Sequence, residues 1–161
     1  MKIKCGIGFD AHKFESNRQL IVGGVEIPFE FGLAGHSDAD VLIHAIIDSI
    51  SGVALGKDIG NLFPDNDMAY KDIDSKILLE KTCKLIWDKG YSISNIDAEI
   101  IAQKPKFAPF IPKMRQIISK IMKIDIDDIS IKATTTEKMG FTGRGEGIAA
   151  ISSSLIIKDD K

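Results

Sequence analysis

Residues 36–52 read HSDADVLIHAIIDSISG, and this stretch decides the fold class because it combines an apolar run with polar side chains at helical spacing. Ser37, followed three residues later by Asp40, resembles an acidic capping box and predicts that a helix begins here. We expect this helix to end near Gly52 or Gly56. Its periodicity predicts two stripes, one for a site (Asp40, His44, Asp48) and one facing the core (Val41, Ala45, Ser49).

Upstream of this helix, the pattern indicates strands. Apolar and polar side chains alternate from residue 3 to residue 9, which predicts a strand that ends where Asp10 and His12 begin. The alternating residues are Ile3, Cys5, Ile7 and Phe9. Residues 20–27 place two short apolar runs on either side of Gly23-Gly24, a pair that tolerates the positive φ angles of a tight turn. We therefore expect a β-hairpin after the first strand.

Downstream, the sequence predicts two more helices and three more strands. Residues 74–89 form an amphipathic helix closed by Gly90, with Ile77, Leu78, Leu85 and Ile86 facing inward. A third helix opens around Pro109 and Pro112 and turns Met114, Ile117, Ile118 and Ile121 toward the core. The strand patterns cover residues 96–102, 129–135 and 148–157. Loops are expected at residues 58–67 and 136–147, and the first is a candidate for movement.

Three amphipathic helices interspersed with five or six short strands predict an α+β fold, a two-layer α/β sandwich with a single mixed sheet covered by helices on one face. The 161 residues fit one domain, residues 1–161. Because the strands carry apolar residues on both faces, we expect copies of the chain to associate through the uncovered face.

The composition excludes several classes of protein. Hydrophobic residues make up 44% and charged residues 27% of the chain, which is normal for a globular protein. The net charge of -2 argues against nucleic acid or an anionic membrane as a partner. Cys5 and Cys83 do not suggest a disulfide framework, and no apolar stretch reaches the ~18 residues of a membrane span. We expect a cytoplasmic protein, or a plastid-type one whose transit peptide was removed.

All three histidines lie in the first third of the chain, beside acidic residues. In the D-x-H segment, Asp10 and His12 point to the same side of an extended backbone and can reach one ion. His44 is the candidate third ligand, with Asp40 one turn away to accept a hydrogen bond from its imidazole. Two histidines and one carboxylate suit catalytic zinc with an open fourth position. The alternative, a turn-forming aspartate with ordinary polar histidines, stays open here.

A second candidate site covers Ala133-Thr134-Thr135-Thr136-Glu137-Lys138 and the glycine-rich residues 140–147. Hydroxyls and exposed backbone N–H groups at a strand end can bind phosphate oxygens, and a glutamate can hold a hard cation such as Mg²⁺. A threonine-rich strand before a glycine-rich turn is the alternative. Lys104-Pro105-Lys106 is either an anion site or a solvated strand end, and Phe63-Pro64-Asp65 is either part of a lid or, as we favour, a surface turn.

Four separated blocks of this sequence resemble the 2-C-methyl-D-erythritol 2,4-cyclodiphosphate synthase family of the non-mevalonate isoprenoid pathway. They are residues 8–12 (GFDAH), 36–44 (HSDADVLIH), 58–65 (DIGNLFPD) and 133–147 (ATTTEKMGFTGRGEG). Four blocks in the right order, in a chain of the family's length, are far more specific than any one motif.

The resemblance implies one catalytic domain that acts as a metal-dependent lyase. In this family the 2-phosphate of 4-diphosphocytidyl-2-C-methyl-D-erythritol 2-phosphate attacks the β-phosphorus of the same molecule, which forms the cyclic diphosphate and releases CMP. The resemblance implies one Zn²⁺ per subunit on Asp10, His12 and His44, and Mg²⁺ or Mn²⁺ at Glu137 with the substrate diphosphate. The catalytic residues it implies are Asp10, His12, His36, Asp65, Thr135 and Glu137.

The resemblance also implies how the substrate is bound. His36, Ser37 and Asp65 are expected at the methylerythritol end, and Asp58 and Gly60 at the ribose or the substrate hydroxyls. Cytosine and its phosphate are expected to meet a third set of residues, Ala102, Lys104, Pro105, Lys106, Ala133, Thr134 and Thr135. The family is a homotrimer with active sites between subunits, and a central cavity near Phe141 and Arg144 is a candidate site for an isoprenoid diphosphate.

Two positions depart from the family pattern. Gly35 stands where a larger residue such as alanine is expected, which should loosen the His36 loop. Ala39 stands where glycine is more frequent, and we expect it to favour the helix by up to about 1 kcal/mol. Two other functions are weighed against the synthase: a zinc hydrolase with Asp58 or Asp65 as general base, and a trimeric protein that only binds isoprenoid diphosphates.

Overall fold

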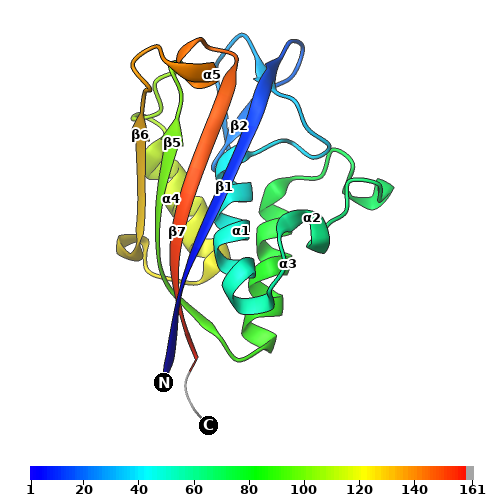
Figure 1. Ribbon diagram of the computed structural model, residues 1–161, viewed down its shortest axis with the longest axis vertical. Helices are drawn as coiled ribbons and strands as arrows, with labels where there is room; N and C mark the ends of the chain where they lie inside the picture. The colour runs from blue at the N-terminus through cyan, green and yellow to red at the C-terminus, as the bar shows by residue number, and fades with distance from the viewer. Residues whose placement is uncertain (159–161) are drawn as a thin grey trace.

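A computed structural model describes residues 1–158 and contains one five-stranded mixed sheet (Figure 1). The strand order is β4-β1-β7-β5-β6. The strands are β1 (Lys2–Glu15), β4 (Gly32–Leu33), β5 (Ser92–Ile101), β6 (Ile129–Thr134) and β7 (Gly147–Lys158). Only β5 and β6 are parallel. The expected hairpin is present as β2 (Leu20–Val22) and β3 (Val25–Ile27), and it forms a small sheet of its own.

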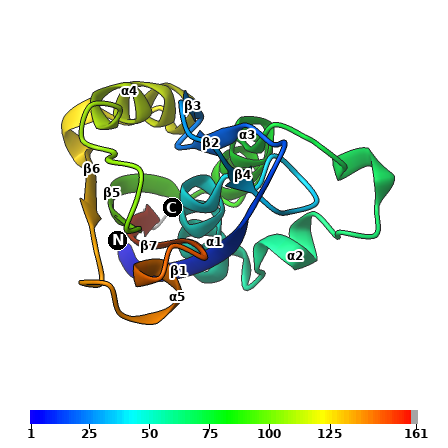
Figure 2. The ribbon, with the colours of Figure 1, turned by 90° about the horizontal axis from the view of Figure 1, so that it is seen from above.

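The three long helices lie on one face of this sheet (Figure 2), which confirms the predicted fold class. They are α1 (Val41–Leu55), α3 (Ser75–Asp88) and α4 (Ile111–Met122). The chain also forms two short helices, α2 (Ile59–Leu62) and α5 (Gly140–Gly143), and 3-10 turns at Met68–Tyr70 and Ile126–Asp128. Helix α1 packs on β1 and β7, and α4 packs on β6. Helix α3 packs on α1 and α4 and forms an outer cover.

Two glycines of β1 let α1 approach the sheet closely. A side-chain Cβ at Gly6 would lie 1.9 Å from the carbonyl oxygen of Ser49, and one at Gly8 would lie 2.0 Å from that of Ala45. Any larger residue would therefore push the helix outward. Asp10 and His12 follow Gly8 by two and four residues, so they lie on the same face of the strand, because side chains alternate along a strand. The glycines thus bring α1 to the polar end of this face.

Three details of the predicted elements are wrong. The first strand does not end at Phe9, because β1 continues to Glu15 and carries Asp10 and His12 within it. The N-cap of α1 is Asp40 and not Ser37. The third error concerns the faces of α1, which are not divided into a site face and a core face. The sheet covers one side of the helix and α3 covers the other, so residues 41–51 are all buried except Asp48.

Some of the residues expected to face the core are exposed instead. In α3, Ile77 and Leu85 are 43% and 42% exposed, whereas Leu78 and Ile86 are buried as predicted. In α4, Met114 and Ile118 are buried, and Ile117 and Ile121 are only partly covered. The helix ends agree better with the sequence, since α1 ends at Leu55 with Gly56 in the left-handed conformation after it.

The uncovered face of the sheet is apolar along β1. Ile3, Ile7 and Phe9 point away from the helices and are 53%, 71% and 58% exposed. The alternating residues of the first strand therefore do not build the core of this chain. Within residues 1–158, both cysteines are free, and no helix has the length and apolar content to cross a membrane.

Asp40 joins the β2–β3 hairpin to the start of α1. Its carboxylate is fully buried and accepts hydrogen bonds from the backbone N–H groups of Gly23 (2.9 Å), Gly24 (2.6 Å) and Ile43 (3.0 Å). Burial, aided by the charge of Asp38, raises the pKa of Asp40 to about 6. One side chain therefore caps the helix and holds the hairpin against it.

We predict that Asp40→Ala lowers the free energy of unfolding by about 3 kcal/mol or more, because three backbone N–H groups lose their acceptor inside the protein. Urea unfolding monitored by circular dichroism measures the loss. The matched control is Asp74→Ala, which removes the partly exposed N-cap of α3 and should cost only about 1 kcal/mol. Equal losses in the two variants would contradict this role of Asp40.

Candidate metal centre

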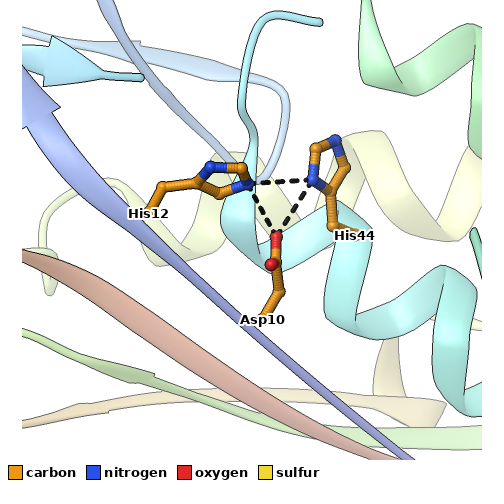
Figure 3. A group of neighbouring side chains, drawn as sticks. All are labelled: Asp10, His12 and His44. Carbon is orange, nitrogen blue, oxygen red and sulfur yellow. Dashed lines mark hydrogen bonds and ion pairs between the residues drawn. The ribbon is translucent and has the colours of Figure 1, made fainter. Parts of the chain in front are cut away.

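Asp10 and His12 of β1 and His44 of α1 converge on one point (Figure 3). Asp10 Oδ2 lies 2.8 Å from His12 Nε2 and 3.0 Å from His44 Nδ1, and the two nitrogens are 3.2 Å apart. The sequence predicts this grouping from the D-x-H spacing and the position of His44. The tight packing of α1 on β1 makes it possible.

The hydrogen bond of the other ring nitrogen sets the tautomer of His12. Its Nδ1 lies 2.7 Å from the carbonyl oxygen of Ala34, which can only accept a hydrogen bond. Nδ1 therefore carries the proton, and Nε2 of a neutral His12 presents a lone pair to Asp10. A backbone carbonyl behind a metal-binding histidine is a common way to orient the ring.

The same argument applies to His44, with a partner that differs from the predicted one. Asp40 makes no side-chain hydrogen bond to this imidazole, because its oxygens are taken by backbone N–H groups. Instead His44 Nε2 lies 2.9 Å from the hydroxyl oxygen of Ser75, whose own proton is donated to Asp38. Nε2 must then donate to Ser75, and Nδ1 of a neutral His44 faces Asp10 with a lone pair.

Two nitrogen lone pairs and a carboxylate oxygen therefore meet within 3.2 Å, an arrangement that requires a positive charge between them. The electrostatics agree. Burial raises the pKa of Asp10, yet its contacts with the imidazoles of His12 and His44 outweigh this effect and hold the pKa of Asp10 far below its usual range. Burial lowers the pKa of His12, but Asp10 outweighs this effect and raises it overall. The cluster is therefore a candidate metal centre.

A cavity of about 230 Å³ opens beside the three candidate ligands. It brings together four other residues that the sequence predicts for the substrate site, namely His36, Ser37, Gly60 and Asp65. The apolar part of its lining consists of Ile59, Phe63, Tyr70 and Leu78. The cavity is large enough for a small polar molecule, and it ends at the candidate metal centre.

Three residues that support this cavity were not predicted from the sequence. Arg18 donates hydrogen bonds to the carbonyl oxygens of Gly35 (3.0 Å) and Ser37 (2.8 Å) and so holds the loop that carries His36. Asp38 and Ser75 lie behind His44. No spacing in the sequence could reveal Ser75, because 31 residues separate it from the histidine that it contacts.

The remaining predicted site residues lie elsewhere in the chain. Those expected near cytosine lie at or just after the C-terminal ends of the parallel strands β5 and β6. There the Lys138 N–H donates a hydrogen bond to the side chain of Gln103. The predicted residues are Ala102, Lys104, Pro105, Lys106, Ala133, Thr134 and Thr135, and the Lys104–Pro105 peptide bond is cis. Glu137 follows them and accepts a hydrogen bond from the Thr135 hydroxyl.

This second group is distant from the candidate metal centre. Strand β6 is three strand spacings from β1, or about 14 Å. Thr134 is in the same row of the sheet as Ala11, so it points to the uncovered face, whereas Asp10 and His12 point toward the helices. One chain therefore does not bring the two predicted halves of the site together.

Asp58, Phe141 and Arg144 also lie outside the cavity lining. Asp58 caps α2 by accepting a hydrogen bond from the Asn61 N–H, and this bond lowers the pKa of its carboxyl group. Phe141 is 40% exposed in α5. Arg144 is paired with Glu146 at 2.6 Å, so an anionic ligand would have to compete with that carboxylate.

Gly35 and Ala39, the two positions expected to depart from the family pattern, lie against each other. We expected Ala39 to favour the helix, but it lies outside α1, just before the N-cap. Its φ of 57° is in the left-handed region, which disfavours alanine. Its side chain fills the space beside Gly35: a Cβ at Gly35 would lie 2.8 Å from Ala39 Cβ and 3.2 Å from His12 Cε1. Only one of the two positions has room for a methyl group.

We predict that Gly35→Ala alone destabilises the protein by about 1–3 kcal/mol through overpacking and weakens its affinity for added zinc by displacing His12. Adding Ala39→Gly should restore both properties. It removes the methyl group that the new Cβ at position 35 would meet, and it removes the cost of about 1 kcal/mol of an alanine in the left-handed conformation. Urea unfolding and competition with a zinc chelator measure the two effects. A double variant no better than Gly35→Ala would refute the compensation.

The fold and this site define the class: an α+β enzyme with a candidate metal centre between strand and helix. The sequence profile of the YgbB family matches residues 3–157, and the chain belongs to this family. A relative from Bacteroides fragilis, named 2-C-methyl-D-erythritol 2,4-cyclodiphosphate synthase, is 59% identical over 97% of this chain and 98% of its own. A relative of the same name from Clostridium perfringens is 56% identical over 97% of this chain and 100% of its own.

Solved structures share the fold. The bifunctional IspDF from Campylobacter jejuni superposes with a TM-score of 0.94 at 43% identity, covering 99% of this chain and 43% of that longer one. IspF from Plasmodium falciparum, in complex with CDP, superposes with a TM-score of 0.85 at 38% identity, covering 98% of this chain and 97% of its own. The family resemblance drawn from the four sequence blocks is confirmed.

Proposed function

We propose that this chain is a 2-C-methyl-D-erythritol 2,4-cyclodiphosphate synthase that acts in isoprenoid precursor biosynthesis. An oxygen of the substrate 2-phosphate forms a bond to the β-phosphorus, and the bond from this phosphorus to the oxygen bridging to the α-phosphate breaks, so CMP leaves. The observation that carries the proposal is the cluster of Asp10, His12 and His44 at the end of a polar cavity, in a chain of this family.

We propose zinc as the ion of this cluster. Two imidazole nitrogens and one carboxylate oxygen are typical of catalytic zinc, and a tetrahedral ion with bonds of about 2.0–2.1 Å would hold its ligands about 3.3 Å apart. The present separations of 2.8–3.2 Å are close to that value. When bound, the ion would offset the charge of the diphosphate and polarise a phosphoryl oxygen. Magnesium or manganese beside Glu137 would carry the rest of the diphosphate charge.

The residues of the cavity would hold the reacting groups in line. His36 and Ser37 lie on the loop held by Arg18 and are suited to the methylerythritol end, and Asp65 lies on the opposite loop. Their contribution is orientation, because a phosphate held near the β-phosphorus makes the attack effectively unimolecular. Asp58 and Gly60 would meet the hydroxyls, as in the family.

We propose that the cytidine end binds to the segments after β5 and β6. The CDP complex of the Plasmodium falciparum protein supports a cytidine diphosphate group as part of the ligand. Because these segments lie about 14 Å from β1 in one chain, we propose a homotrimer in which a partner chain completes each site. The exposed apolar residues of β1 provide the interface that such an assembly requires. The relatives from Bacteroides fragilis and Clostridium perfringens are bacterial, and the proposal includes a cytoplasmic location.

We expect purified protein with zinc and magnesium to convert the cytidine substrate into cyclic diphosphate and one equivalent of CMP. In ¹⁸O-labelled water, phosphorus NMR should find no label in either phosphorus product, because no water attacks. A chelator should stop the reaction, and added zinc should restore it. Incorporation of label would instead indicate a zinc hydrolase, and fully metallated protein that released no CMP would refute the synthase.

We predict that Ile7→Asp and Phe9→Asp convert the assembly into single chains, since a charge in each copy of an apolar interface opposes association. Light scattering after size-exclusion chromatography measures the mass, and CMP release should fall with it. Leu85→Asp is the matched control, because Leu85 is also exposed but lies on the outer helix α3. A trimer that survives both substitutions would place the interface elsewhere.

A further inference from the structure

Ser75 is a fully buried serine whose hydroxyl is not needed for the helix that it begins. It is the first residue of α3, and the N-cap of this helix is Asp74, whose side chain accepts the capping hydrogen bond from Lys76 N–H. Ser75 Oγ instead lies 2.9 Å from His44 Nε2 and donates its proton to Asp38 Oδ1. The hydroxyl therefore connects a carboxylate to a candidate metal ligand.

Asp38 is itself held in place by several donors. Its Oδ2 accepts a hydrogen bond from Ser75 N–H at 3.0 Å, and its Oδ1 accepts one from Asp40 N–H at 3.2 Å in addition to the Ser75 hydroxyl. Its own N–H is bonded to the carbonyl oxygen of Ile73. With both Ser75 groups pointing at it, the carboxylate fixes the direction of the hydroxyl proton, and Ser75 can only accept from His44.

We infer that Asp38 and Ser75 form a hydrogen-bonded relay that positions the His44 imidazole, so that Nε2 carries the proton and Nδ1 is presented to the metal. This inference deepens the proposed function and rests on its metal site. The negative charge of Asp38 polarises the Ser75 hydroxyl, and the hydroxyl strengthens the basicity of the imidazole on its far side. Both are positioning residues, since they act through His44 Nε2 and supply none of the three candidate ligand atoms.

A second hydroxyl near His44 is a weaker partner. Ser37 Oγ lies 3.2 Å from Nε2, but it also accepts a hydrogen bond from Ala39 N–H and is not linked to a carboxylate. It cannot orient the imidazole by itself, because a free hydroxyl can turn to donate or to accept. The ordered pair, Ser75 with Asp38, is what distinguishes the two tautomers.

The test measures zinc affinity by competition with a chromophoric chelator in the full chain. Ser75→Ala should weaken zinc binding by about 10–100-fold, the usual effect of losing a partner behind a metal-binding histidine. Asp38→Asn keeps an acceptor without the charge and should cause a smaller loss. In the double variant, Asp38→Asn should add nothing to Ser75→Ala, because the carboxylate acts through the hydroxyl.

The matched control is Ser51→Ala, which removes another fully buried serine hydroxyl that has no hydrogen-bond partner in the described structure. Its zinc affinity should equal that of the wild type. Unchanged affinity in Ser75→Ala, or additive losses in the double variant, would overturn the relay. Should Ser75→Ala fail to fold, unchanged affinity in Asp38→Asn would overturn it equally.

A second measurement does not depend on zinc. Long-range ¹H–¹⁵N NMR of the zinc-free protein at pH 9 reports which nitrogen of His44 carries the proton. Because Asp10 Oδ2, 3.0 Å from Nδ1, competes for this proton in both proteins, the relay requires a larger fraction protonated at Nε2 in the wild type than in Ser75→Ala. If the wild type bound no zinc, the zinc assignment of the proposed function would fail, and this tautomer would still decide the relay. Equal tautomer populations in both proteins would refute it.

Discussion

The close packing of α1 against β1 is the contact on which the rest of the structure depends. Gly6 and Gly8 leave space for nothing but the helix backbone, so the carbonyl groups of Ser49 and Ala45 lie directly on the strand. This short distance between strand and helix places His44 within 3.0 Å of Asp10. A helix held farther out by ordinary side chains would separate the imidazole from the carboxylate and remove the candidate metal centre.

Around this contact, the buried carboxylate of Asp40 and the partly buried carboxylates of Asp38 and Asp10 accept hydrogen bonds from different donors. Asp40 takes backbone N–H groups of the hairpin and of α1, and Asp38 takes the hydroxyl and N–H of Ser75. A buried charge without partners is costly, so this division stabilises the fold as well as the site. Asp10 accepts a backbone hydrogen bond on Oδ1 only. Its Oδ2 faces the imidazoles of His12 and His44, whose protons are on the nitrogens that point away from Asp10. It is therefore the carboxylate that requires a cation.

The two faces of the sheet have different roles, one in the candidate metal centre and the other in the proposed association of chains. Its covered face carries Asp10 and His12, whereas its uncovered face carries the exposed Ile3, Ile7 and Phe9 on the same strand. Alternation of side chains makes this possible, since every second residue of β1 serves the site and the others remain free for association. In the proposed trimer, one strand would thus both hold the metal ligands and bind the partner chain that supplies the cytidine site.

The sequence alone determined the fold class, the three long helices and the hairpin, because periodicity is a local property. For Asp10, His12 and His44 it left a metal site and ordinary polar residues as alternatives, and the resemblance to a known family favoured the metal site. It also identified the family through four blocks of residues. It misplaced the N-cap of α1, assigned Asp40 instead of Ser75 to His44, and put Ala39 in a helix. Only the tertiary structure decided these points, since the partner of a buried polar group depends on which distant segments pack together. Ser75 meets His44 because α3 lies against α1, and no spacing along the chain records that contact.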